Sequence, residues 1–146
     1  MSYENPWYFN NVLVDEETVY EYVGFVYNIT NLATGKKYIG KKLFTKAKTK
    51  QVKGKKKRVR VSSDWKTYYG SNKDLQEDVE KLGSHNFKRE ILRLCKTKGE
   101  CNYWEAKYQF DNRVLESDKY YNSWIMVKVH KAHVDQQAES GDLKSP

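Results

Sequence analysis

The chain has 146 residues, enough for one domain around a single hydrophobic core but too few for two. Hydrophobic residues make up 38% of it, yet no apolar run is long enough to cross a bilayer and no leader pattern is visible, so we expect a soluble, intracellular (cytoplasmic) protein without a membrane partner. The net charge of +8 favours an anionic partner, and the two cysteines, Cys95 and Cys101, lack the paired spacing of a zinc site.

The positive charge is confined to one region of the chain. Residues 22–63 contain thirteen Lys or Arg and no Asp or Glu, whereas the other 104 residues hold the remaining fourteen basic residues and all 19 acids, a balance of −5. A localised positive field is typical of a protein that binds a polyanion, because each neutralised phosphate releases condensed counterions. A charge run taken alone more often forms a solvated surface. Here it directly follows a tyrosine-rich hairpin, and we therefore favour nucleic acid.

The N-terminal arm, residues 1–23, is polar and aromatic. We expect an irregular lead-in whose rings pack on the domain, with a short strand at 12–14. The acidic residues at 15–17 predict a turn that keeps the arm soluble.

A β-hairpin is predicted next, at residues 24–40. Two short runs of aromatic and β-branched residues flank a polar turn at 30–35, which is the usual pattern of a hairpin. A symmetric loop would place Tyr27 opposite Tyr38. Both phenols would then lie on one face as a cross-strand pair.

A basic segment follows the hairpin, and eleven of the twenty residues from 41 to 60 are Lys or Arg. Little helical periodicity is present after residue 47, so we interpret about 43–63 as an insertion, partly a basic loop or a β-ribbon, that lies along a nucleic-acid backbone. The aromatic residues at 65–69 either stack on bases or pack beneath this insertion. The side chains expected to bind nucleic acid are Lys42, Lys46, Lys53, Lys55, Lys56, Lys57, Arg58 and Arg60.

A helix and a strand are predicted after the insertion. Ser71 is the expected N-cap of the helix, apolar residues recur on one face, and Gly83 provides the stop. Residues 87–94 then form a largely buried strand.

The last predicted elements are a second helix and a final strand. Thr97 and Glu100 form a capping-box pair that opens a helix from 98 to about 115. An aromatic and β-branched strand is expected at roughly 124–129. Residues 131–146 lack an apolar face and are expected to be a disordered tail.

Two short motifs carry a family resemblance. Residues 26–29 read Val-Tyr-Asn-Ile and residues 38–40 read Tyr-Ile-Gly, with the two tyrosines eleven positions apart. This pair resembles the motifs that name the GIY-YIG nuclease superfamily, and the compact size resembles its phage-encoded or homing-type members. Val26 stands where the family has Ile, and Gly24 lies one residue too early. The resemblance covers roughly residues 24–122.

The resemblance implies a fold and a domain plan. The fold is α/β of the α+β kind, a small three-stranded antiparallel sheet flanked by helices, with the basic insertion after the first hairpin. The plan is an arm at 1–23, a nuclease domain at 24–130 and a tail at 131–146.

The resemblance also implies site residues. Glu105 would bind Mg²⁺ or Mn²⁺, Asn122 matches an asparagine after the late helix, and Lys41 matches a lysine of the excision-repair branch. Tyr27 would accept or relay a proton from the attacking water, and Tyr38 would hydrogen-bond the phosphate or that water. An ordinary phenol has a pKa of about 10, so a base needs cations nearby, which Lys41 would supply.

One position departs from the family pattern. Lys48 stands ten residues after Tyr38, where the family usually has a catalytic arginine, and lysine lacks the planar fork that grips two phosphate oxygens. Three alternatives stay open: Lys48 serves as a point charge, Arg58 or Arg60 moves in from the insertion, or the site is weakened.

These residues together favour a metal-dependent DNA endonuclease that nicks one strand or cleaves both, with a homodimer as one route to double-strand cleavage. Each residue also has a structural explanation when taken singly, such as hairpin packing for the tyrosines or an ion pair of Glu105 with Lys107 or Arg113. The alternative functions are an inactive nucleic-acid-binding module that keeps the fold, and an interaction protein whose basic loop contacts an acidic partner.

Overall fold

The structure is a computed structural model and describes residues 5–126. Its main sheet has five strands in the order β2-β1-β7-β3-β4. β3 runs antiparallel to both of its neighbours, whereas β1 runs parallel to β7. The α+β class is confirmed, but the expected three-stranded sheet is too small. The strands are β1 (Trp7–Phe9), β2 (Val12–Leu13), β3 (Gly24–Asn31), β4 (Lys37–Leu43) and β7 (Phe87–Cys95).

The larger sheet comes from the N-terminal arm, which was predicted to be irregular. Trp7 of β1 is fully buried, and its indole nitrogen donates to the carbonyl of Trp65 at 2.7 Å. Because this large ring belongs to the core, the arm is held against β7. Residues 15–17 begin a helix instead of the predicted turn. The Asp15 side chain accepts from the Glu17 amide at 3.1 Å and caps α1 (Glu16–Glu21).

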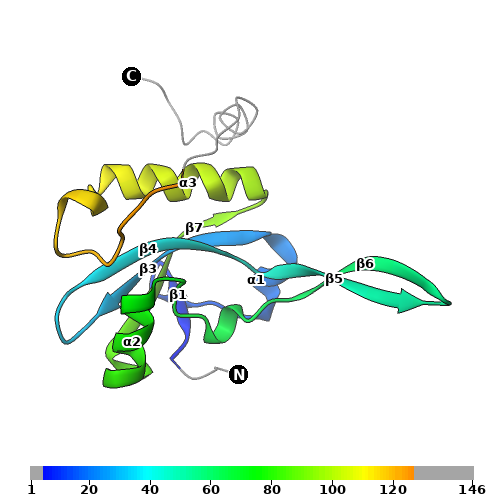
Figure 1. The fold of residues 1–146 in the computed structure, drawn as a ribbon, viewed down its shortest axis with the longest axis horizontal. Helices are drawn as coiled ribbons and strands as arrows, with labels where there is room; N and C mark the ends of the chain where they lie inside the picture. The colour runs from blue at the N-terminus through cyan, green and yellow to red at the C-terminus, as the bar shows by residue number, and fades with distance from the viewer. Residues whose placement is uncertain (1–4, 127–146) are drawn as a thin grey trace.

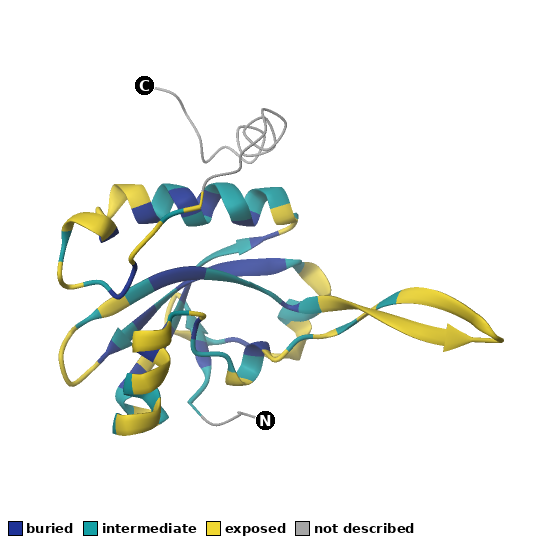
Figure 2. Cartoon of the chain, viewed as in Figure 1, coloured by how far each residue is buried: buried dark blue, intermediate teal, exposed yellow. Residues whose placement is uncertain are grey.

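Helices cover both faces of the sheet (Figure 1). The helix α3 (Lys98–Asp111) packs on one face, where Cys101 and Trp104 join a core cluster with Val26. On the other face lie α2 (Lys73–Leu82) and the short turn η1 (Trp65–Thr67), over a core that contains Tyr27 and Phe25. Figure 2 shows the buried residues concentrated in the strands between these layers. No helix within residues 5–126 has the length and apolar character to span a membrane.

Capping residues fix where the helices begin and end. Asn72, not the predicted Ser71, caps α2, because the Asn72 side chain accepts from the Leu75 amide at 3.0 Å. The Thr97 cap of α3 is confirmed, with its hydroxyl accepting from the Glu100 amide at 3.0 Å. α3 ends before the predicted residue 115, because Arg113 adopts a left-handed conformation with φ of 52°. The chain then forms the short turn η3 (Val114–Glu116).

The hairpin register differs from the symmetric prediction. Ile29 pairs with Tyr38 and Tyr27 pairs with Gly40, so the register is shifted by two residues. The shift follows from a longer turn, in which the Asn31 amide donates to the Lys36 carbonyl at 2.8 Å. A shift of two keeps each side chain on its face. The two tyrosines therefore still share a face, as a diagonal pair with ring centroids 6.1 Å apart.

The basic insertion forms a β-ribbon, which confirms that alternative over an irregular loop. Its strands are β5 (Thr45–Val52) and β6 (Lys55–Ser62), antiparallel and separate from the main sheet. Lys53 and Gly54 make the tip with positive φ values of 51° and 78°. The ribbon projects from the body in Figure 1 and is almost entirely exposed in Figure 2.

The predicted final strand is absent where the structure describes it. Residues 124–126 have no regular secondary structure, and residues 127–129, like the predicted tail at 131–146, lie outside the described residues. Tyr120 instead makes an isolated parallel bridge with Lys37. This bridge brings residues 119–122 to the exposed edge of β4.

Candidate active site

A cleft opens at the edge of β4, between the two helical layers. It has a volume of about 250 Å³. β4 contributes Tyr38 and Lys41, and α3 contributes Glu105. The lining residues are Tyr38, Lys41, Ser71, Glu105, Gln109, Trp124 and Met126. Three of the predicted site residues therefore meet in one place.

Glu105 is the acidic group of the cleft. Its side chain is 18% exposed, and the Lys41 ammonium lies 3.8 Å from its Oε1. Burial raises the pKa of Glu105, while the Lys41 charge and a hydrogen bond from the Lys41 backbone act in the opposite direction. Lys41 also donates to the amide oxygen of Asn102, one turn earlier on α3. The cation partner of Glu105 is thus Lys41, not Lys107, which pairs with Asp111 at 3.2 Å.

Tyr38 is the phenol that reaches the cleft. Its hydroxyl lies 3.2 Å from the Ser71 hydroxyl, and Ser71 also lines the cleft. Burial raises the pKa of Tyr38, and the Ser71 hydrogen bond partly opposes that shift. The Tyr38 hydroxyl therefore stays protonated at neutral pH and can donate to an anion.

Tyr27 is buried beneath the same strand and is only 1% exposed. A β-carbon added at Gly40 would lie 2.6 Å from the Tyr27 hydroxyl oxygen. The glycine of the second motif therefore leaves the space that the first tyrosine fills. Burial first, and then the neighbouring Tyr68, raise the pKa of Tyr27, which favours the protonated phenol.

Asn122 completes the edge of β4 instead of pointing into the cleft. Its side-chain amide accepts from the Ile39 N–H at 3.1 Å and donates to the Ile39 carbonyl at 2.8 Å. The backbone of Lys37 is paired in the same way, donating to the Lys119 carbonyl at 2.8 Å and accepting from the Tyr121 amide at 2.7 Å. The outward-facing backbone groups of Lys37 and Ile39 are thus satisfied by the segment after α3, as a further strand would do.

A basic hollow adjoins the cleft and shares Lys41 with it. The hollow lies where the ribbon leaves the main sheet, and Arg60 and Lys46 enter it from the ribbon while Lys98 enters from the start of α3. Arg60 is oriented by Thr45, whose hydroxyl and carbonyl accept from the guanidinium at 2.7 to 3.1 Å. The cationic residues of the hollow are Lys41, Lys42, Lys46, Arg60 and Lys98.

The other predicted basic residues are placed differently. Lys42 is 20% exposed, pairs with Asp64 at 2.6 Å and lies 4.0 Å from the centre of the Tyr68 ring, so it is engaged in the fold. Lys48 is an exposed residue of β5, paired with Val59, and lines neither the cleft nor the basic hollow. The remaining predicted nucleic-acid contacts are all exposed on the ribbon: Lys53, Lys55, Lys56, Lys57 and Arg58.

The donor set of the cleft fits a hard divalent cation. Glu105 presents a partly buried carboxylate whose pKa is raised by burial, and the Lys41 charge opposes that shift only in part. Among residues 5–126 no three His, Cys, Asp or Glu side chains gather into a metal site. Mg²⁺ and Mn²⁺ accept such a site, because carboxylate, water and substrate oxygens suit both and Mg²⁺ keeps several waters.

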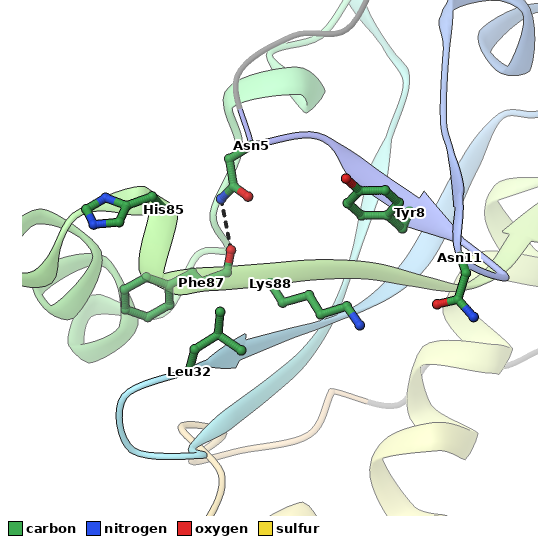
Figure 3. Close-up of a pocket in the computed structure, with 7 residues that line it drawn as sticks. All are labelled: Asn5, Tyr8, Asn11, Leu32, His85, Phe87 and Lys88. Atoms are coloured by element: carbon green, nitrogen blue, oxygen red, sulfur yellow. Dashed lines mark hydrogen bonds between the residues drawn. The ribbon is translucent and has the colours of Figure 1, made fainter.

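A second hollow lies beside the start of β7, and Figure 3 draws the residues that line it. Its volume is about 350 Å³. The side chain of Asn5 closes one end of it and donates to the Phe87 carbonyl at 2.9 Å. This hollow shares no residue with the cleft and carries no carboxylate. The chemistry expected of the site therefore belongs to the cleft, not to this hollow.

Sequence reasoning missed five cleft or near-cleft residues, namely Ser71, Asn102, Gln109, Trp124 and Met126. Ser71 was taken as a helix cap, and Asn102 lies one turn before Glu105 on the same helix face. Gln109, one turn after Glu105, donates to the Ile39 carbonyl at 2.9 Å. The (i, i+4) spacing around Glu105 could have identified Gln109, but no local signal marks Trp124.

Comparisons with known proteins identify the family of the chain. The family model "Putative endonuclease segE, GIY-YIG domain" matches residues 7–125. "Putative endonuclease segE" of Enterobacteria phage T4 is 35% identical over 99 residues, which are 67% of this chain and 39% of that protein. The chain thus spans well under half the length of this curated relative, and no solved structure matches it significantly. The chain belongs to the GIY-YIG nuclease family.

Proposed function

We propose that the protein is a metal-dependent DNA endonuclease that hydrolyses phosphodiester bonds in the Glu105 cleft. One observation carries the proposal. Tyr38, Lys41 and Glu105 line a single cleft, and Lys41 also lines the basic hollow at the foot of the ribbon. A backbone bound along the basic hollow would place a phosphate beside the acid and the phenol.

Glu105 would hold Mg²⁺ or Mn²⁺. Such an ion, when bound, neutralises charge on a phosphate oxygen and on the leaving 3′ oxygen. The Lys41 ammonium, now 3.8 Å from Glu105, would turn to the phosphate and stabilise the charge that develops there. Asn102 would position that ammonium, because its side-chain oxygen accepts from it.

Tyr38 would donate its hydroxyl hydrogen bond to the phosphate or hold the attacking water. Its raised pKa disfavours a standing phenolate. If the Tyr38 oxygen took a proton from the water, the phenol would have to pass its own proton to the Ser71 hydroxyl, 3.2 Å away, and the exposed Ser71 would release its proton to solvent. Tyr27 is 1% exposed, so it would not touch substrate and would instead support Tyr38 by packing against it.

The residue that replaces the family arginine is Arg60 in this proposal. Arg60 shares the basic hollow with Lys41, and its guanidinium can grip a phosphate with two parallel hydrogen bonds. Lys48 lies further out on the ribbon and would bind the backbone as a point charge.

Cleavage of supercoiled plasmid tests the proposal. The wild type and Glu105→Gln would be incubated with Mg²⁺, with Mn²⁺ and with EDTA, and open-circle and linear products measured. We expect metal-dependent cleavage by the wild type and none by the variant, with Glu116→Gln, a change at an exposed glutamate, as the matched control. Cleavage that persists in EDTA or in Glu105→Gln would refute the assignment.

A second candidate is a DNA-binding module without catalysis. It is favoured by one observation, namely that no arginine is among the described residues that line the cleft. This alternative predicts retardation of DNA that weakens steeply with salt, with no cleavage in either metal.

One centre per chain nicks one strand, so linear product in the plasmid assay would require a homodimer or two binding events.

A further inference from the structure

We propose that one face of the β5–β6 ribbon reads base pairs in the major groove of duplex DNA. The proposal rests on the proposed function for the nature of the substrate and goes further by assigning sequence recognition to named side chains. The ribbon has room to do so, because it is exposed along its length and stands apart from the main sheet (Figure 2).

The pairing register divides the ribbon into two faces. Directly paired residues share a face, and alternate residues of each strand share it too. Thr49 pairs with Arg58 and Gln51 pairs with Lys56 on one face. Lys48 pairs with Val59 on the other. We call the first the reading face and the second the lysine face.

The reading face carries the side chains that recognise bases. Arg pairs with the two acceptors of guanine, Gln pairs with the acceptor and donor of adenine, and Thr contacts either polar edges or the thymine methyl group. Arg58, Gln51 and Thr49 lie together on this face towards the ribbon tip. None of their side chains has a hydrogen bond or ion pair with any residue from 5 to 126, so all three are available to a ligand.

The lysine face has a different composition. It holds Lys46, Lys48, Lys50, Lys55 and Lys57, separated by valines that offer no base-reading group. Lys50 and Lys57 are directly opposite each other, an arrangement that costs free energy unless an anion lies between them. No acid occurs anywhere in residues 45–62 to relieve this repulsion within the ribbon. Phosphates on the walls of a groove would do so.

The dimensions fit B-form DNA. Its major groove is about 12 Å wide and admits a two-stranded β-ribbon. Each strand has eight residues, and at about 3.4 Å per residue they extend about 27 Å. The deep, narrow major groove of an RNA helix would exclude the ribbon. The foot of the ribbon lines the basic hollow through Thr45 and Arg60, so the bases read would lie to one side of the cut, within about one helical turn.

Selection from a duplex DNA library with a randomised centre tests the inference. The full chain binds the library in EDTA, so that no cleavage occurs, and bound duplexes are sequenced. We expect the wild type to enrich a preferred sequence. Arg58→Lys, which keeps the charge but loses the fork, and Gln51→Ala should each lose the preference at one position and weaken binding to the preferred duplex by about five- to a hundredfold.

Lys57→Gln and Lys50→Gln are the matched controls on the lysine face. Each should keep the preferred sequence and lower the slope of log affinity against log salt by about one. Arg58, Gln51, Lys57 and Lys50 are all exposed. A urea unfolding midpoint equal to that of the wild type would show that a variant folds normally. A wild type that enriches no sequence, an Arg58→Lys variant that enriches the same sequence, or equal binding of duplex RNA would each overturn the inference.

Plasmid nicking by the same preparations reports the proposed function separately. Nicking without sequence selection would disprove base reading and leave the nuclease standing. Sequence selection without nicking in Mg²⁺ or Mn²⁺ would support base reading and disprove the nuclease.

Discussion

The side-chain amide of Asn122 bonds to both backbone polar groups of Ile39, accepting from its N–H at 3.1 Å and donating to its carbonyl at 2.8 Å. An amide can do this because it has a donor and an acceptor side by side. The pair attaches the segment after α3 to the strand that carries Tyr38 and Lys41. The asparagine that the family resemblance marks as a site residue therefore contacts the strand behind the cleft, and any effect that it has on the site would pass through β4.

Asn122→Asp should weaken this attachment. A carboxylate can still accept from the Ile39 N–H, but it faces the Ile39 carbonyl with no proton to donate. We expect the free energy of unfolding, measured in urea, to fall by about 1–3 kcal/mol, and plasmid cleavage to fall with it. Asn10→Asp, at an exposed residue in the turn between β1 and β2, should change stability by less than about 0.5 kcal/mol. Equal midpoints for the two variants would contradict the assigned role.

Gly40→Ala should displace Tyr27. The added methyl would lie 2.6 Å from the Tyr27 hydroxyl oxygen and 2.9 Å from a ring carbon of Tyr38, so both rings must move. We expect destabilisation of about 1–3 kcal/mol together with reduced cleavage. The double variant Gly40→Ala/Tyr27→Phe lacks the Tyr27 hydroxyl oxygen, which is the atom nearest to the added methyl, and should recover part of the lost stability. A double-mutant cycle with no coupling would show that the predicted contact does not limit the site.

The raised pKa of Tyr121 predicts that the protein loses stability at alkaline pH. Its hydroxyl donates to Asp78 at 2.6 Å, and burial first, then Asp78, raises the pKa of Tyr121 to about 12. Below pH 10 the phenol is protonated in both folded and unfolded chains, and its contribution is complete. Between about 10 and 12 only the unfolded chain ionises at this residue, so the free energy of unfolding falls as pH rises.

The measurement compares the wild type with Tyr121→Phe by urea unfolding at several pH values between 9 and 12. The variant lacks the titrating group, so the stability difference between the two proteins should shrink by about 2 kcal/mol across that interval. Tyr20→Phe, at a residue that is 88% exposed, is the control and should follow the wild type. Parallel curves for the wild type and Tyr121→Phe would count against the shifted pKa.

Much of the fold follows from local patterns in the sequence. The hairpin, the β-ribbon, the helix cap at Thr97 and the buried strand of β7 are all marked by alternation, turn residues or capping residues. β1 was missed because it has three residues and pairs with a strand about eighty positions away in the sequence. The register of the hairpin was wrong because the turn is closed by contacts of Asn31 that symmetry about the loop does not reveal.

The cleft could be predicted only in part. Tyr38, Lys41 and Glu105 were identified through the family resemblance, and the structure brings them together. The burial of Tyr27 could not be read from its motif, because alternation does not distinguish the two faces when both are covered by helices. Lys48 was assigned by counting from Tyr38, and the structure places it on the ribbon strand β5, away from the residues that line the cleft.

Arg60 and Lys48 can be separated by their effects on cleavage and binding. Arg60→Gln should reduce cleavage at saturating protein, because Arg60 lines the basic hollow beside Lys41. Lys48→Gln should leave cleavage at saturation unchanged and lower only the salt slope of binding, by about one. Single-turnover nicking together with filter binding over a range of salt concentrations measures both quantities. The opposite result, with cleavage lost in Lys48→Gln alone, would restore Lys48 to the arginine role.

Arg89 is a buried guanidinium that joins three separate parts of the chain. It is fully buried and donates to the Tyr68 carbonyl at 2.9 Å, to the Lys66 carbonyl at 2.8 Å and to the carbonyl of Asn5. The arm before β1, the segment around η1 and the strand β7 thus share one side chain. The planar fork makes this possible, since it presents several donors in fixed directions.

Arg89→Met and Arg89→Lys should both destabilise the fold. Methionine leaves the three carbonyls without this donor, and the lysine ammonium is a point charge that cannot replace the fork. We expect the free energy of unfolding in urea to fall by about 3 kcal/mol or more for each variant. Lys88→Met, at the preceding and more exposed residue of β7, should stay near the wild type. Arg89 is not among the residues that line the cleft, so the folded fraction of either Arg89 variant should still cleave plasmid. A variant with wild-type stability but no cleavage would show that Arg89 acts on the site instead of on the fold.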